Sequence, residues 1–188
     1  MNLIHRWVCR SGSWRTRLKD CVMPWVLDGV NLGQNVLEVG PGPGLTTDLL
    51  RSRLDRLTAI EIDPKLAAAL KQRMNGSNVR VVEGDATAMP FGPAAFSGVV
   101  SLTMLHHVPS PALQDRLLGE VCRVVKPGGT FAGVDSVWSL RMWLFHIADT
   151  LVAVDPASFG RRLEAAGFTN VSVETDERAF RFRAQRPG

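Results

Sequence analysis

The chain of 188 residues contains no tyrosine and only three cysteines. Cys9, Cys21 and Cys122 lie far apart in the sequence, so they supply neither a disulfide framework nor the C-x-x-C pair of a metal site. No metal site is therefore predicted. A few unpaired cysteines are typical of a protein of the reducing cytoplasm, which is the location we expect.

Long apolar runs are also absent. No stretch approaches the roughly 20 apolar residues that a membrane-spanning helix needs, and the first ten residues lack the continuous apolar core of a secretory signal. We expect no membrane span. A chain of 188 residues is one ordinary domain.

Acidic residues are scarce at both ends of the chain. Residues 1–20 carry a net charge of +4 and the last twelve carry +3, whereas the residues between them carry −3. Basic ends can attract an anionic acceptor, a nucleic acid or a lipid surface. Solvated helix faces and a soluble tail explain the same charges without a partner.

Three glycines at alternate positions follow a short apolar run that is typical of a buried strand. Val36 to Val39 precedes Gly40, Gly42 and Gly44, and an amphipathic run from Leu45 to Leu54 follows them. Glycine permits positive φ angles and lets a ligand approach the backbone, while the start of a helix offers N–H groups. This turn between strand and helix is predicted to hold a ligand.

The spacing of these glycines argues against a dinucleotide. The fingerprint G-x-G-x-x-G places its third glycine where this chain has Leu45. Glu38, at the end of the strand, puts a carboxylate beside the ligand, which suits a cationic amino group better than a diphosphate. An NAD(P)-dependent oxidoreductase is therefore a less favoured alternative.

An acidic residue followed by G-x-G-x-G resembles the first motif of the class I S-adenosylmethionine (SAM) dependent methyltransferases. The motif here is Glu38 with Gly40, Gly42 and Gly44. The resemblance implies an α/β, Rossmann-like, doubly wound sheet of seven strands in the order 3-2-1-4-5-7-6, with the last strand antiparallel. It implies an enzyme that takes SAM as its cofactor, with Glu38 holding the amino-acid end of SAM directly or through ordered solvent.

The resemblance also divides the chain. It runs from about Asn35 to Ala184, so we expect residues 35–188 to form the SAM-binding domain and residues 1–34 a helical cap over the active site. Trp7, Trp14 and Trp25 in the cap segment are expected either to line such a lid or to pack it onto the sheet. Pro24 is predicted to begin a short helix that ends at residue 30.

Two further acids follow predicted strands. Glu61 lies at the end of the strand Leu57–Ile62, about 20 residues beyond the glycines, where a carboxylate reaches the ribose hydroxyls of a bound nucleoside. A solvent-exposed loop acid is the alternative. Asp85 and Ala86 follow the strand Val79–Glu83. By resemblance, they bind the adenine amino group and a ring nitrogen.

His106 and His107 follow the next predicted strand, Phe96–Thr103. Loops at the carboxyl ends of the strands form the ligand crevice, so this loop is expected to face the methyl group of the donor. Imidazole titrates near neutral pH, and either residue is a candidate general base for an acceptor hydroxyl. Alternatively, one imidazole orders the loop and contacts the donor, since many methyl transfers need no base.

The same loop lacks the motif of enzymes that methylate amino groups of nucleic acid bases. Those enzymes typically carry N-P-P-Tyr or D-P-P-Tyr here, whose ring stacks on the extruded base. This chain has Ser101-Leu102-Thr103-Met104 and no tyrosine. A nucleic acid acceptor is therefore not expected, although Glu61-Ile62-Asp63 resembles the ribosomal RNA dimethyladenosine enzymes. A non-catalytic SAM-binding or RNA-binding module is a further alternative.

The segment Ser136–Thr150 is strongly apolar and lies between the predicted fifth strand, Thr130–Val134, and a helix that begins at Pro156. In the family that the chain resembles, this interval carries acceptor specificity. A small apolar or aromatic acceptor would suit it. An extra helix packed on the core explains the composition equally well, and a dimer face is a third interpretation.

Overall fold

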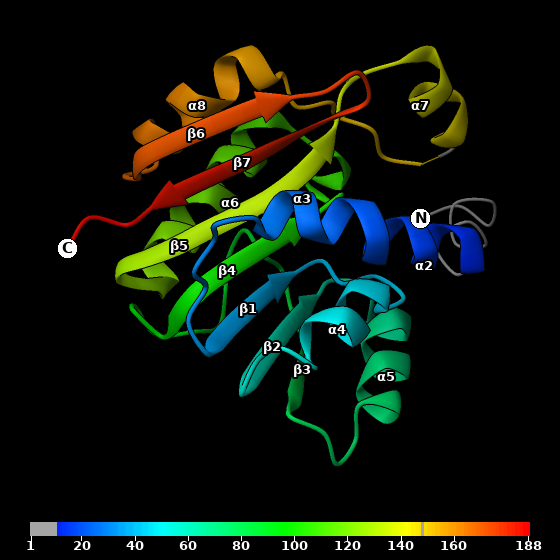
Figure 1. Ribbon diagram of the computed structural model, residues 1–188, viewed down its shortest axis with the longest axis vertical. Coiled ribbons are helices and arrows are strands. Elements are labelled where there is room, and N and C mark those ends of the chain that lie inside the picture. The colour runs from blue at the N-terminus through cyan, green and yellow to red at the C-terminus, as the bar shows by residue number, and fades with distance from the viewer. Residues whose placement is uncertain (1–10, 148) are drawn as a thin grey trace.

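The computed structural model describes residues 11–147 and 149–188, and its centre is one seven-stranded sheet (Figure 1). The strand order is β3-β2-β1-β4-β5-β7-β6. β7 runs antiparallel to both of its neighbours, and the other strands are parallel to one another. The predicted fold class, strand order and antiparallel last strand are confirmed. The strands are β1 (Asn35–Val39), β2 (Arg56–Glu61), β3 (Val79–Glu83), β4 (Phe96–Leu102), β5 (Val125–Ser136), β6 (Thr169–Thr175) and β7 (Ala179–Gln185).

Helices cover both faces of the sheet (Figure 1). α3, α4 and α5 lie on one face, and α6 and α8 on the other. Side chains alternate between the two apolar layers along each strand, so that Val36 packs on the α3 side and Leu37 on the α6 side. The helical elements are α2 (Gly12–Arg17), η1 (Leu18–Val22), α3 (Met23–Leu27), α4 (Leu45–Leu50), α5 (Pro64–Arg73), η2 (Leu105–His107), α6 (Pro111–Val124), α7 (Leu140–Phe145) and α8 (Pro156–Ala165).

Three helices begin at a capping side chain followed by proline, as their sequences indicate. Asp63, Ser110 and Asp155 each accept a hydrogen bond from a backbone N–H in the first turn of α5, α6 and α8. These caps fix the residue at which each helix begins.

The N-terminal helical segment differs from its prediction. Pro24 does not begin a helix, because the chain is already helical from Gly12 and stays helical to Leu27. The turn before Pro24, Leu18–Val22, is π-helical. Proline has no N–H to donate to the preceding turn, and a wider π-turn accommodates that gap without ending the helix.

β5 is also longer than predicted. The fifth strand was predicted over Thr130–Val134, but β5 begins at Val125 and ends at Ser136. Val125 pairs with Phe96 of β4, and the register shifts before Thr130 pairs with Gly98. Within the described residues, every helix is too short or too polar to cross a membrane.

Candidate active site

A cavity of about 360 Å³ opens at the carboxyl ends of the central strands. Its walls come from the β1–α4 turn, the ends of β2 and β3, the loop after β4, α6 and the N-terminal helical segment. β1 and β4 are neighbours at the point where the strand order reverses, which is where α/β sheets bind their ligands. The volume is within the range of small-molecule sites.

The glycine turn forms one wall of this cavity, and its three glycines have different surroundings. All have positive φ angles: +67° at Gly40, +55° at Gly42 and +83° at Gly44. A Cβ on Gly42 would meet no protein atom within 4 Å and would project into open space, whereas one on Gly40 would lie 2.9 Å from the Met104 side chain. Gly40 and Gly42 line the cavity. A Cβ on Gly44 would instead collide with α5, so this glycine allows helix packing.

Glu61 joins the end of β2 to the glycine turn. Its two carboxylate oxygens accept hydrogen bonds from the backbone N–H of Gly42, at 2.9 Å, and of Asp63, at 3.0 Å. The side chain lines the cavity and only 6% of the residue is exposed. The alternative of a solvent-exposed loop acid is therefore wrong.

Asp85 and Ala86 line the same cavity at the end of β3. One Asp85 oxygen accepts a hydrogen bond from the backbone N–H of Thr87, at 2.8 Å, which fixes the loop. The cavity thus collects the residues for which nucleoside contacts were predicted from the ends of three adjacent strands.

Glu38 is placed differently from the other acids. It is 1% exposed and is not among the residues that line the cavity. Its carboxylate accepts hydrogen bonds from the hydroxyls of Thr46 and of Thr47, the latter at 2.6 Å. Burial raises the pKa of Glu38 to about 7, and the two threonine hydroxyls oppose that shift. Glu38 therefore ties β1 to α4, and Thr46, which the sequence analysis did not single out, presents its side chain to the cavity.

The two adjacent histidines of η2 have separate environments. His107 lines the cavity. His106 is buried, and its Nδ1 lies 2.5 Å from Oδ1 of Asp135 at the end of β5. Asp135 is fully buried and was not predicted as a site residue. Its sequence signal is an acid directly after the apolar run Phe131–Val134.

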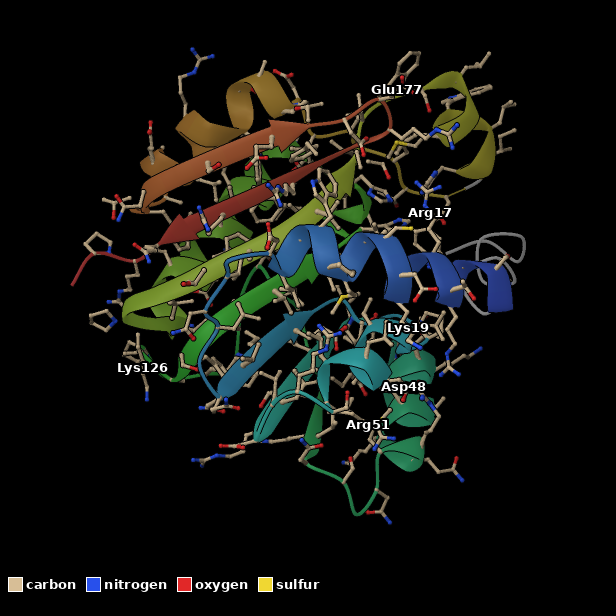
Figure 2. The ribbon with its side chains drawn as sticks, in the orientation of Figure 1. Arg17, Lys19, Asp48, Arg51, Lys126 and Glu177 are labelled. Carbon is tan, nitrogen blue, oxygen red and sulfur yellow. The ribbon has the colours of Figure 1, made fainter. Side chains whose placement is uncertain are left out.

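The N-terminal segment closes over the cavity through Trp14 and Leu18. Arg15 binds Asp48 of α4 at 3.3 Å, and Arg73 of α5 binds the same carboxylate. Asp48 also lies beside Arg51 on α4 (Figure 2). Trp25, on α3, packs against the apolar layer between this helix and the sheet. Trp7 lies outside the described residues.

A model of the methyltransferase domain family matches residues 37–133, which is just over half of the chain. The chain belongs to the class I SAM-dependent methyltransferase family. The match runs from β1, the strand before the glycine turn, to the middle of β5. It includes the glycine turn and the carboxyl ends of β2 and β3, which together form the donor side of the cavity. SAM is the methyl donor of this family.

Curated relatives of this chain are named for different acceptors. The chain is 34% identical over 134 residues to the ubiquinone biosynthesis O-methyltransferase of Pseudomonas fluorescens, a match that covers 68% of this chain and 56% of the relative. It is 42% identical over 84 residues to a probable ribosomal RNA small subunit methyltransferase A of Thermococcus onnurineus, covering 45% and 29%. The chain thus spans less than two thirds of either relative.

The fold of the methyltransferase also matches a solved structure over its whole length. A chain in the complex of the Haloferax volcanii Trm112 methyltransferase activator with a methyltransferase superposes with a TM-score of 0.74. The match covers 100% of this chain and 99% of that chain, at 16% identity. This similarity concerns the fold.

The donor side of the cavity fits SAM. The side chain of any other residue at position 42 would fill the space in front of Gly42. The carboxylates of Glu61 and Asp85 lie at the ends of the two adjacent strands. Their oxygens are hydrogen-bond acceptors, which suits the hydroxyl and amino donors of a nucleoside.

The apolar segment of the methyltransferase, residues 136–150, contains the short helix α7. Met142 and His146 are buried, whereas five large apolar side chains are more than half exposed. These are Trp138, Leu140, Trp143, Leu144 and Ile147. Asp149 and Thr150, just after the helix, line the cavity. The interpretation as a helix packed on the core thus fits only the inner face of α7.

Proposed function

We propose that the protein transfers the methyl group of SAM to a small acceptor that is apolar or aromatic. The observation that carries the proposal is one cavity that contains both the glycine turn and an apolar wall. This wall lies on the side of the cavity away from β2 and β3, toward β4 and the N-terminal segment. It consists of Trp14, Leu18, Met104, Val108, Leu113 and Leu117.

On the donor side, the residues that line the cavity have the roles expected from the sequence. Gly40 and Gly42 let the backbone approach the donor, and Glu61 accepts hydrogen bonds from the ribose hydroxyls. Asp85 and Ala86 hold adenine. Gly44 and Glu38 act indirectly, because Gly44 permits the packing of α4 on α5 and Glu38 positions Thr46.

Bound SAM supplies a methyl group already activated by the positive charge on sulfur. The protein therefore contributes alignment and exclusion of water. The described part of the expected cap, residues 11–34, covers the cavity, which is supported by Trp14 and Leu18 in its lining, and residues 35–188 form the domain beneath it. Of the two candidate bases, His107 is supported because it lines the cavity, whereas His106 is bonded to Asp135.

A relative named for ubiquinone biosynthesis supports an aromatic or quinone-like acceptor. The 42% identity to a ribosomal RNA methyltransferase, together with the basic N-terminal segment, makes RNA the second candidate acceptor. The loop Ser101–Met104 opposes RNA, because it offers no aromatic ring on which an extruded base would stack. The two described cysteines are free thiols, which agrees with a cytoplasmic location.

The experiment is methyl transfer from isotopically labelled SAM into a metabolite extract and, separately, into ribosomal RNA. We expect label in an apolar small molecule, with a product that mass spectrometry identifies. Trp14→Ala should slow this transfer, whereas Trp138→Ala, at an exposed position outside the cavity lining, is the matched control. Label in RNA alone would overturn the proposed acceptor class. Thermal stabilisation by NAD(H) and not by SAM would overturn the donor.

A further inference from the structure

Three of the four histidines of the chain meet beside the cavity. His106 and His107 are adjacent on η2, and His146 follows α7, about 40 residues further along the chain. One nitrogen from each ring lies within 4.8 Å of the others, and the ring centroids are 4.3 to 5.1 Å apart. His106 and His146 are buried, and His107 is half-buried. Such a group cannot be recognised from sequence spacing.

Two of these rings are oriented by a hydrogen bond at Nδ1. Nδ1 of His106 bonds to the Asp135 carboxylate at 2.5 Å, and Nδ1 of His146 bonds to the backbone carbonyl oxygen of Met142 at 2.7 Å. A neutral imidazole that donates from Nδ1 presents Nε2 as its acceptor nitrogen. Histidines that bind metals almost always donate their other N–H to a carboxylate or a backbone carbonyl in this way.

The loop that carries two of the rings is held in place. The backbone N–H of His106 donates to Oδ2 of Asp135 at 3.2 Å, and its carbonyl oxygen accepts from Val152 at 2.8 Å. Gln114 of α6 donates to the carbonyl oxygens of Leu105, at 3.1 Å, and Val152, at 2.9 Å. A supporting shell of this kind is what a metal site needs to keep its ligands in position.

We propose that His106, His107 and His146 bind a divalent transition metal ion, with zinc as the best fit. Imidazole ligands suit zinc, copper, nickel and iron rather than magnesium or calcium. Zinc–nitrogen bonds of about 2.0–2.1 Å in a tetrahedron require nitrogens roughly 3.4 Å apart. The ligand nitrogens, which lie within 4.8 Å of one another, must therefore approach by at most about 1.4 Å when the ion binds.

Three protein ligands leave a tetrahedral zinc ion with one open position. Because His107 lines the cavity, this position is accessible to an acceptor oxygen or sulfur. The charge of the ion lowers the pKa of a bound hydroxyl or thiol, whose proton passes to solvent. In this arrangement, His107 is a metal ligand and not the general base. This use of the site rests on the proposed function, whereas metal binding does not.

The test is a titration of the chelator-treated full chain with cobalt(II), whose visible absorption is intense when four ligands surround it tetrahedrally. Zinc competition then gives the zinc affinity. We expect one equivalent to bind in the absence of SAM and acceptor. His107→Gln and His146→Gln should each weaken binding by at least about 100-fold, since loss of a supporting partner alone costs 10- to 100-fold. Trp143→Gln, at an exposed position of α7, is the matched control and should leave binding unchanged.

Circular dichroism must show that each variant is folded, and His107→Gln, at a half-buried position, is the variant least expected to disturb the core. Asp135→Asn adds a test of orientation, with an expected loss of about 10- to 100-fold. Absence of stoichiometric binding to the wild-type chain, or wild-type affinity in folded His107→Gln and His146→Gln, would overturn the metal site. Because neither result involves methyl transfer, failure here is distinct from failure of the proposed function.

Discussion

The two sides of the cavity are held in different ways. On the donor side, formed by the carboxyl ends of β1, β2 and β3, side-chain oxygens bond to nearby backbone N–H groups and hydroxyls, as Glu61 does with Gly42. On the acceptor side, formed by the apolar wall, η2 and residues 136–150, His106 is held by Asp135 at the end of β5, and five large apolar side chains are exposed to solvent, three of them on α7.

The two sides therefore differ in how freely their side chains can be substituted. A donor side fixed by hydrogen bonds between the ends of neighbouring strands holds its acceptor oxygens in set positions. An acceptor side built on a short helix can change its apolar side chains at little cost to the sheet, because exposed positions contribute little to stability. Variants on each side should therefore affect different measured quantities.

The largest expected effect concerns Glu38, whose carboxyl has a pKa near 7 in the folded chain, above the 4.5 of the unfolded one. Below pH 4.5 the carboxyl is protonated in both states and stability is unaffected. Between pH 4.5 and 7 only the unfolded chain releases the proton, so the free energy of unfolding falls as pH rises, by about 3 kcal/mol in total. Glu38→Gln removes this dependence.

Urea unfolding of both proteins at pH 5 and pH 8 measures this effect. The variant should gain about 3 kcal/mol relative to wild type between the two pH values. Glu120→Gln is the control: a hydrogen bond from Arg123 lowers the pKa of Glu120 below its ordinary 4.5, so its stabilising effect is constant between pH 5 and pH 8 and is lost only in stronger acid, and this variant should parallel wild type. Parallel profiles for wild type and Glu38→Gln would contradict the buried, raised-pKa carboxyl.

A smaller effect is expected for Glu61→Ala, which tests the donor side by binding. The change removes the acceptor for the N–H groups of Gly42 and Asp63 as well as for the ribose hydroxyls. The SAM dissociation constant should rise about 30-fold, equivalent to about 2 kcal/mol. Calorimetric titration of the folded variant checks this value.

The chain offers a matched control for that experiment. Glu83 ends β3 directly opposite Glu61 in the register, yet it is exposed and does not line the cavity. Glu83→Ala should leave SAM affinity unchanged. If both substitutions weaken binding equally, charge at this edge of the sheet matters and the proposed ribose contact does not.

The donor side was largely predictable from the sequence because its residues lie close to their strands. Gly40, Gly42, Glu61 and Asp85 each follow an apolar run, and parallel strands bring their carboxyl ends to the same edge. Glu38 was predicted to meet the donor, but its partners Thr46 and Thr47 lie in the first turn of α4, and only the folded β1–α4 unit brings them into contact with it.

The acceptor side was not predictable in the same way, since its contacts join distant segments. His106 follows β4, whereas Asp135 lies at the end of β5. The distance from His146 to the other two histidines depends on how α7 packs. The π-helical turn before Pro24 was not predictable either, because a proline usually begins a helix, whereas here the helix continues through it and buries Met23 and Val26 against the sheet.

The smallest expected effect concerns the outer face of α7. Leu144 is 53% exposed, so Leu144→Ala should change the free energy of unfolding by less than about 0.5 kcal/mol and leave SAM affinity unchanged. Met142 on the same helix is 8% exposed, and Met142→Ala should cost about 2 kcal/mol. Urea unfolding compares the two variants. Equal destabilisation would show that α7 packs on the protein with both faces, and the acceptor side would then be as firmly held as the donor side.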